Sequence, residues 1–281
     1  MEPDNSIPET SPVTPAPEPA STAARVFLGP DGLRAGWRFL IYLAAFAGLA
    51  FAAWYGRQKR GKLQGSMPDL PQLAREIRYS VVAVLIFGLV NAVIAAWSIG
   101  PHTQLYFDVA QHGWVYFWLS IPLMILVHDA YFYWTHRLMH TRALFRTFHA
   151  VHHLSTNPTP WTAYAFHPLE SVVQALGVVL ILFIMPSHPL ALILFQTVST
   201  EINVYGHLGY EIYPRGTAGH WLGRWINTSV AHNFHHETAR HNYGFYFLFW
   251  DRLMGTLDPG YEARYAAGTA EGLPAGGARA G

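Results

Sequence analysis

The stretch SVVAVLIFGLVNAVIAAWSI, residues 80–99, runs for twenty positions without a charged side chain. A helix needs about 20 consecutive apolar residues to cross the hydrocarbon core of a bilayer. The stretch is too long for a single strand, and the segments around it lack the two-residue alternation of a half-buried strand. Residues 80–99 therefore predict a transmembrane helix in an all-α protein.

Other apolar runs lie on both sides of this stretch. They cover Phe39–Tyr55, Trp114–Val127, Ser171–Met185 and Leu190–Thr200. The last two are shorter and are separated by the sequence PSHP at 186–189, which predicts a helical hairpin that spans the membrane or re-enters it. The expected fold class is an all-α integral membrane protein with about three to five transmembrane or re-entrant helices.

Composition divides the chain into four segments. Residues 1–24 and the C-terminal residues are rich in Pro, Ser, Thr, Ala and Gly, and such sequences bury too little apolar surface to offset the entropy of ordering. The predicted segments are a disordered Pro-rich tail at 1–24, N-terminal transmembrane helices at 25–113, a histidine-rich domain at 114–262 and a disordered tail at 263–281.

The composition also excludes several classes of protein. Hydrophobic residues make up 51% of the chain and aromatic residues 15%, as in membrane proteins. The formal net charge of +1 and the lack of a Lys/Arg block argue against a nucleic-acid partner. Because the chain has no cysteine, a bound metal ion must be held by nitrogen or oxygen atoms.

Lys and Arg are distributed unevenly between the predicted loops. The loop Gly56–Tyr79 carries six of them, whereas residues 100–113 carry none. The positive-inside rule therefore places the first loop in the cytoplasm. The third predicted span then returns to the cytoplasm, and the hairpin after it leaves and returns on one side. We expect a multi-pass protein whose helical cap, which carries the histidine motifs, faces the cytoplasm.

Three short motifs contain eight of the sixteen histidines: HRLMH (136–140), HAVHH (149–153) and HNFHH (232–236). Helix residues three and four apart share a face, with Cβ atoms about 5–6 Å apart, so their rings can converge on one metal ion or two adjacent ions. The isolated histidines His102, His112, His188 and His220 are interpreted as interfacial or hydrogen-bonding residues. The candidate ligands from the motifs are His136, His140, His149, His152, His153, His232, His235 and His236.

The number of candidate ligands narrows the kind of metal site. Eight imidazoles exceed what a tetrahedral zinc site uses, and two metals with four or five ligands each fit the count. Soluble di-iron bundles use Glu-x-x-His pairs, and this chain has no Glu three residues before a His. Neutral ligands leave positions open for dioxygen, which points to oxidative chemistry on a membrane substrate.

Four stretches resemble, in order and spacing, the fatty acid hydroxylase/sterol desaturase superfamily. They are HDAYFYWTHRLMH (128–140), HAVHHLSTNPTPWTAYAFHPLE (149–170), NVYGHLGYEIYP (203–214) and HNFHHETARHNYGFYFLFWDRLMGT (232–256). The resemblance covers about residues 115–260, so that 114–262 becomes the expected catalytic domain. It implies a membrane-embedded enzyme with two non-haem iron ions, which uses dioxygen and two external electrons to hydroxylate or desaturate a membrane lipid.

The resemblance also implies a ligand set and a redox partner. It adds His207, in GHLGYE, to the eight histidines of the three motifs, and the same nine are the expected catalytic residues. Some members have a further histidine four residues before this position, where this chain has Asn203. Because no flavin, haem or nicotinamide motif is recognised in the sequence, the electrons are expected from a cytochrome b5-like protein, a ferredoxin or a reductase.

Several residues near the motifs can be interpreted in more than one way. His128 is either a further metal ligand or a hydrogen-bonding or proton-relay group with Asp129, and the second interpretation is favoured. Asp129 either faces water or Arg137, or hydrogen-bonds a ligand imidazole. Glu170 and His167 either support the site or stabilise a turn, and Glu237 is a candidate hydrogen-bond acceptor beside the last motif.

The expected reaction is hydroxylation of a C–H bond in a sterol-like, hopanoid-like or fatty acyl lipid, because GHLGYE and NYG look more like the sterol-oxidase and hydroxylase side of the superfamily. Desaturation of a lipid is the alternative. A histidine-rich metal transporter or a membrane pH sensor is the alternative from another class, although neither requires the same histidine spacing twice.

Overall fold

The computed structural model describes residues 62–96 and 102–268. Within this part of the chain every regular element is a helix, and the extended backbone forms only two isolated bridges. The prediction of an all-α protein is thus confirmed. The predicted span Phe39–Tyr55 and the predicted tail at 1–24 lie outside the described residues.

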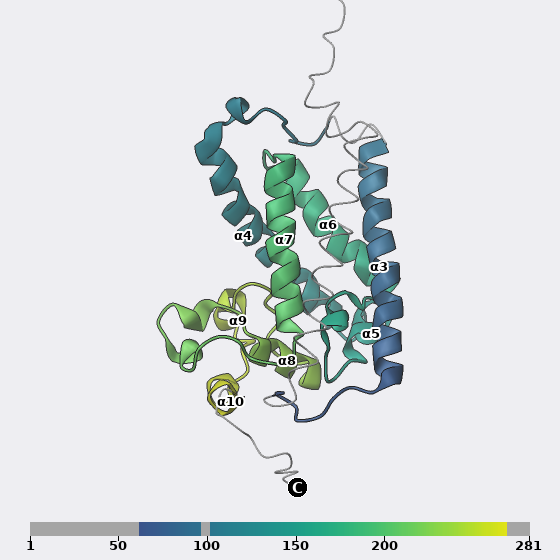
Figure 1. Cartoon of the computed structure of the whole chain (residues 1–281), viewed down its shortest axis with the longest axis vertical. Helices are drawn as coiled ribbons and strands as arrows, with labels where there is room; N and C mark the ends of the chain where they lie inside the picture. The colour runs from purple at the N-terminus through teal and green to yellow at the C-terminus, as the bar shows by residue number, and fades with distance from the viewer. Residues whose placement is uncertain (1–61, 97–101, 269–281) are drawn as a thin grey trace, which may run out of the picture. The chain divides into compact units, whose positions relative to one another are not determined.

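Four long helices form the main body of the described part (Figure 1). They are α3 (Leu70–Ala96), α4 (Gly113–Met139), α6 (Pro168–Ile184) and α7 (Pro189–Gly206). Helices α3 and α4 are long and apolar enough to cross a membrane by length and composition, and most of their apolar length is not buried by the protein. Exposed side chains such as Leu85 (67%) and Val115 (83%) need an apolar surrounding. The fold is that of a helical membrane protein.

The hairpin predicted from the sequence PSHP is confirmed by α6 and α7. Each helix begins with a proline at its first position, where a missing backbone N–H costs nothing. The histidine before each proline caps the helix, since His167 Nδ1 accepts from the Leu169 N–H at 3.3 Å and His188 Nδ1 from the Leu190 N–H at 3.2 Å.

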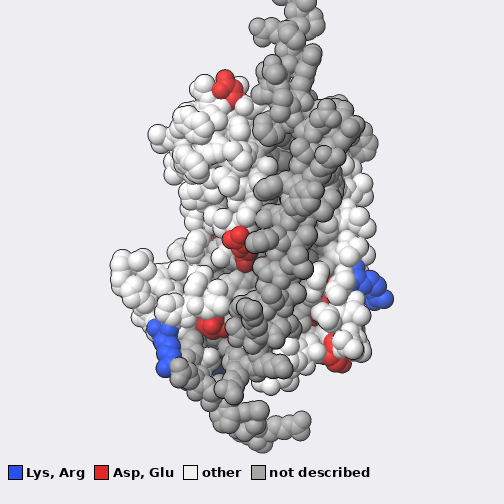
Figure 2. All heavy atoms as spheres, viewed as in Figure 1, with Lys and Arg blue, Asp and Glu red and all other residues white. Residues whose placement is uncertain are grey.

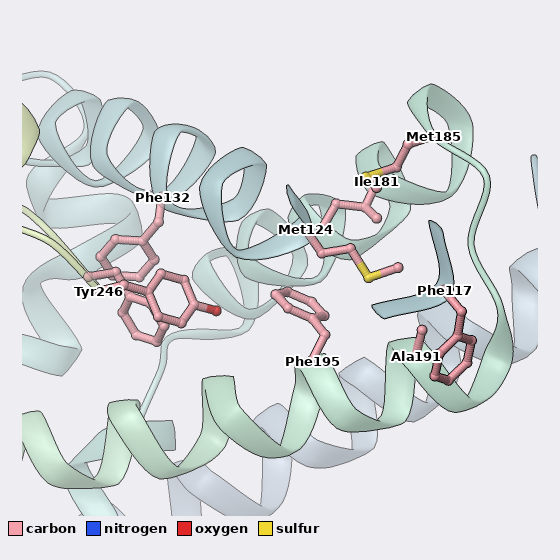
Figure 3. Packing of buried hydrophobic residues seen from close by; sticks show 9 residues of the cluster. Phe117, Met124, Phe132, Ile181, Met185, Ala191, Phe195 and Tyr246 are labelled. Carbon is pink, nitrogen blue, oxygen red and sulfur yellow. The ribbon is translucent and has the colours of Figure 1, made fainter. Parts of the chain in front are cut away.

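Buried side chains hold α4, α6 and α7 together (Figure 3). Within lipid, helices associate through close packing rather than through exclusion of water. The cluster contains Phe117, Met124 and Phe132 of α4, Ile181 of α6 and its C-terminal cap Met185, Ala191 and Phe195 of α7, and Phe245 and Tyr246 of the segment after α8. The C-terminal part of the chain is thereby packed against the long helices.

Short helices gather at one end of the four long helices (Figure 1). They are α5 (Ala150–His153), α8 (Ser229–Thr238), α9 (Phe249–Leu253) and α10 (Tyr261–Gly268), with single turns between them. In the view of Figure 2, the Lys and Arg side chains lie towards this end, while the described surface over the long helices is almost free of charge. This end is therefore the polar end of the described part.

Helix α3 begins at Leu70, ten residues before the predicted start at Ser80, so the last ten residues of the predicted loop Gly56–Tyr79 are helical. Polar contacts explain the extension. The Asp69 carboxylate accepts from the Gln72 N–H at 2.8 Å, and the fully buried Glu76 accepts from the Thr159 hydroxyl at 2.5 Å. The polar residues just before the apolar run therefore belong to a packed helix rather than to a loop.

The predicted disordered tail at 263–281 is wrong for its first six residues, which belong to α10. Tyr265 is only 1% exposed, and its hydroxyl donates to the Pro214 carbonyl at 3.0 Å. Burial of this one aromatic side chain orders a segment whose overall composition resembles that of a disordered tail.

Candidate metal centre

Nine of the predicted histidines lie together at the polar end of the long helices, in two groups. In each group, one nitrogen from every residue lies within 4.8 Å of the corresponding atoms of the others. The five-imidazole group contains His136, His140, His149, His153 and His235. The four-imidazole group contains His152, His207, His232 and His236.

The ends of several helices supply these side chains. The last turn of α4 carries His136, and His140 is its C-terminal cap. A π-helical turn at Phe145–His149 leads into α5, and together they present the three histidines of HAVHH. Helix α8 presents the histidines of HNFHH, and His207 directly follows α7. The spacing that predicted shared faces is therefore realised on α4 and α8.

Backbone and carboxylate acceptors fix the orientation of five of these rings. Each of the five presents its Nδ1 atom to an oxygen outside the two groups. The pairs are His136 with Tyr243 O (2.9 Å), His149 with Glu170 Oε1 (2.6 Å), His207 with Asn203 O (2.7 Å), His235 with His241 O (2.6 Å) and His236 with Ser155 O (3.0 Å). A carbonyl can only accept, so in the four rings that face a backbone carbonyl Nδ1 carries the proton and Nε2 keeps a lone pair.

The lone pairs point at one another inside the groups, which is unfavourable without a cation. Nε2 of His136 lies 3.0 Å from Nε2 of His149 and 3.2 Å from Nε2 of His140. The Nε2 atoms of His235 and His236 are buried without a hydrogen-bond partner. Because unpaired buried acceptors are costly, the donor set fits one metal ion in each group.

The protonation state of the rings agrees with metal binding. Burial, reinforced by the neighbouring His136, lowers the pKa of His140 to about 2, and burial lowers the pKa of His207 to about 4. Burial and the surrounding imidazoles also hold the pKa of His149, His153 and His235 well below the usual value. The rings are neutral at pH 7, which is the form that binds a metal.

A cavity lies between α3, α4, α6 and α7, next to both groups. Its wall includes Phe132, whose ring centre is 5.0 Å from that of His136, and Phe166, whose ring centre is 5.2 Å from that of His152. Amides and hydroxyls such as Gln174 and Ser199 complete a wall that, among the described residues, contains no Asp, Glu, Lys or Arg. The cavity suits a largely apolar molecule without a charge.

Comparison with known proteins agrees with this geometry. Residues 121–256 match the family model described as fatty acid hydroxylase. The chain is 32% identical over 200 residues to the Delta(7)-sterol 5(6)-desaturase ERG3B of Gibberella zeae, covering 68% of this chain and 60% of that protein. It is 30% identical over 219 residues to the Delta(7)-sterol 5(6)-desaturase erg3C of Aspergillus fumigatus, covering 68% and 67%. The chain belongs to the fatty acid hydroxylase/sterol desaturase superfamily.

A mammalian relative in the superfamily is more distant. The lathosterol oxidase of Mus musculus is 28% identical over 188 residues, covering 66% of this chain and 61% of that protein. The chain thus spans about 60% of the length of the first relatives it matches. No solved structure matches the chain.

Two buried carboxylates fix the segment that follows the last motif of the superfamily. Asp251 accepts from the backbone N–H groups of Tyr243 (2.9 Å) and Gly244 (2.8 Å). Asp129 accepts from those of Tyr246 (2.9 Å) and Phe247 (3.2 Å), so it neither faces water nor bonds a ligand imidazole. The segment so held supplies the Tyr243 carbonyl that orients His136.

Asp251 and Asn227 were missed by the sequence analysis. Asn227 Nδ2 donates to the carbonyls of Gly244 (2.9 Å) and Phe245 (3.0 Å), opposite the N–H groups that Asp251 binds. Asp251 lies in DRLMGT, at the end of the quoted stretch 232–256, and this resemblance to the superfamily could have identified it. Asn227 lies outside the quoted stretches, and its role depends on backbone contacts that leave no pattern.

The remaining predicted residues divide between the site and the scaffold. Glu170 contacts His149, as one of its two interpretations predicted, whereas His167 caps α6. Glu237 is exposed and pairs with Arg264 at 3.3 Å, so it does not accept from a ligand. Asn203 contributes its backbone carbonyl to His207, and its amide donates to the Ala163 carbonyl at 2.6 Å.

His128 belongs to neither group of imidazoles. Its Nδ1 lies 2.9 Å from the Tyr246 hydroxyl, and its ring contacts Phe195 and Phe245 at the wall of the cavity. Two turns of α4 separate it from His136, a rise of about 12 Å. The structure therefore brings together nine of the ten predicted metal ligands.

Proposed function

We propose that this protein is an O2-dependent oxidoreductase that oxidises a C–H bond of a sterol-like membrane lipid. The observation that carries the proposal is the pair of buried, neutral imidazole groups beside an uncharged cavity. The names of the relatives, which are sterol desaturases and lathosterol oxidases, support the lipid class.

Two iron ions are the proposed occupants, one in each group of imidazoles. When bound, they would activate dioxygen so that hydrogen can be removed from an unactivated carbon. The histidines hold the ions with neutral nitrogen, and the outer acceptors hold the rings in place. Phe132 and Phe166 lie between the ligands and the cavity, where they exclude water and bring one carbon of the substrate close to the ligands.

Desaturation is the favoured outcome of the proposed reaction, with hydroxylation as the alternative. The GHLGYE and NYG elements by themselves favour hydroxylation. The first relatives are named as desaturases or as oxidases of a sterol, which supports removal of two hydrogens from adjacent carbons rather than insertion of one oxygen.

The proposed topology is multi-pass, with the two imidazole groups facing the cytoplasm. Arg75 and Arg78 lie in the first turns of α3, at the end that carries the short helices, whereas residues 102–113 at the other end have no Lys or Arg. This asymmetry follows the positive-inside rule. Electrons would then come from a cytoplasmic cytochrome b5-like protein, ferredoxin or reductase.

The decisive measurement is the iron content of the purified protein, with a Mössbauer spectrum of a sample loaded with iron-57. About two irons per chain in a coupled, nitrogen-rich centre are expected. The loaded protein in nanodiscs with a Δ7-sterol is then reduced anaerobically with dithionite, freed of excess reductant and exposed to dioxygen, and the sterol should lose two hydrogens, as read by mass spectrometry. Gain of one oxygen would establish hydroxylation, and failure to bind iron would sink the proposal in favour of a metal-free pH sensor.

A further inference from the structure

His140 is the most accessible of the nine clustered histidines. The other eight are buried, whereas His140 is partly exposed at the C-terminal end of α4. Its ring touches Phe145 with 5.4 Å between ring centres, and Phe145 touches His153 at 5.6 Å. The five-imidazole group therefore reaches the protein surface at His140 and Phe145, while the four-imidazole group does not.

Two loops flank His140 at this surface, and both carry exposed arginines. The segment after α4 provides Arg142 and Arg146, which are exposed. The segment after α8 provides the exposed Arg240, next to Ala239, to whose backbone the His140 imidazole hydrogen-bonds. We call His140, Arg142, Phe145, Arg146 and Arg240 the His140 face.

Negative charge does not balance these arginines locally. The described residues 141–148 and 239–243 contain no Asp or Glu. The acids nearest in sequence to 239–243 have other partners: Glu237 pairs with Arg264 at 3.3 Å, and the buried Asp251 accepts from the N–H groups of Tyr243 and Gly244. Asp258 lies 3.6 Å from His241, which follows Arg240, so one acid stands beside this segment. A partly apolar centre with a rim of one charge is the pattern of a surface that meets a partner of opposite charge.

We propose that the His140 face is the docking surface for a small acidic electron-carrier protein. The inference rests on the proposed function, which requires two external electrons for each turnover. Redox encounters of this kind bury little surface and depend on electrostatic attraction for rapid association. Electrons delivered at this face would enter the five-imidazole group first, through the ligand that is nearest to the partner.

The test reverses charge at the rim and measures the dependence of turnover on the carrier. The probes are the haem domain of cytochrome b5 and a plant-type [2Fe–2S] ferredoxin, each acidic and each with its own NAD(P)H reductase. The double variant R142E/R240E should raise the KM for the carrier by about tenfold or more at low salt, with kcat at saturating carrier nearly unchanged. The effect should shrink as ionic strength rises.

A matched variant controls for loss of surface charge in general. Arg224 is also exposed, but its guanidinium lies over the Trp225 ring, 5.5 Å from its centre, and it is outside both loops of the His140 face. R224E should leave the KM for the carrier unchanged. Dithionite should reduce the metals of all three proteins at the same rate, because a small reductant needs no docking.

The outcomes separate this inference from the proposed function. If iron-loaded wild-type protein forms no product even with dithionite, the proposed function fails. If protein pre-reduced with dithionite forms product on exposure to dioxygen but neither carrier supports turnover, or if R142E/R240E leaves the KM unchanged, the docking surface is wrong and the function stands. If the double variant matters only in nanodiscs that contain anionic lipid, the arginines contact lipid headgroups and the proposal is overturned.

Discussion

The two imidazole groups differ in number, exposure and support. The five-imidazole group reaches the surface at His140 and uses a carboxylate, Glu170, to orient one of its rings. The four-imidazole group is fully buried, and the outer partners of His207 and His236 are backbone carbonyls. If each group binds a metal ion as proposed, one ion would lie near the surface and the other would be enclosed, and the two would have different roles.

The repeated motif HxxHH is divided between the groups in opposite ways. In HAVHH, His149 and His153 join the five-imidazole group and His152 joins the other. In HNFHH, His232 and His236 join the four-imidazole group and His235 joins the other. In each motif the two histidines four residues apart belong to one group, and the remaining histidine belongs to the other group. Each motif therefore contributes to both groups.

Removing one ligand from each group should show the largest contrast. His235→Gln leaves four imidazoles in its group, as many as the other group has, so about two irons per chain should remain with weakened binding. His232→Gln leaves three, and the iron content should fall towards one. Product formation should fall by about 100-fold or more in both, because catalysis needs both metals in place. Iron analysis and turnover measure the two effects.

His102→Gln is the control for this pair, because His102 is exposed and lies outside both groups. It should leave iron content and turnover unchanged. Greater loss of iron from the His235 variant than from the His232 variant would contradict the assignment of five ligands to one site and four to the other.

Changing an outer partner should have a smaller effect, confined to one group. Glu170→Gln replaces the carboxylate that lies 2.6 Å from His149 Nδ1, and should lower the iron affinity of the five-imidazole group by about 10–100-fold. Asn203→Ala should leave affinity within about threefold, because the backbone carbonyl that His207 uses remains. Competition with a chelator measures both, and equal losses would show that the side chain of Asn203 supports its metal.

Metal-free protein should lose stability as the pH falls below about 6.5. In the unfolded chain an imidazole takes up a proton near pH 6.5, whereas burial lowers the pKa of His207 to about 4. Between these values the unfolded state binds more protons, so each such histidine costs about 1.4 kcal/mol per pH unit on acidification. Thermal unfolding of the apo-protein between pH 7 and pH 4 measures this, and bound iron should flatten the dependence.

Much of this arrangement was readable from the sequence, for a physical reason. Apolar length predicts a spanning helix, and helix geometry brings residues such as His232 and His236 to one face, so the helices and eight of the histidines could be expected. His207 could be expected only from the resemblance to the superfamily. The orienting partners could not, because the carbonyls of Tyr243, His241 and Ser155 belong to backbone that any residue could provide. The division of the motifs between two sites depends on how the helices pack, which spacing does not encode.

Among the ten predicted metal ligands, His128 is the one outside both groups, and changing it should have the smallest effect. His128→Gln should leave the iron content and the Mössbauer spectrum unchanged, and should raise the KM for the lipid by about 3–10-fold, as expected for one altered hydrogen bond at the wall of the cavity. Gly177→Ala is the matched variant, because its added Cβ would lie 2.9 Å from Tyr131 Cδ1 and 3.0 Å from His128 Cδ2. It should displace the His128 ring while keeping an imidazole at this position. Similar increases in KM from both variants, with two irons retained, would show that His128 contacts the substrate in the cavity. Loss of iron from His128→Gln would instead show that His128 is a metal ligand, and would contradict the division of the ligands into the two groups.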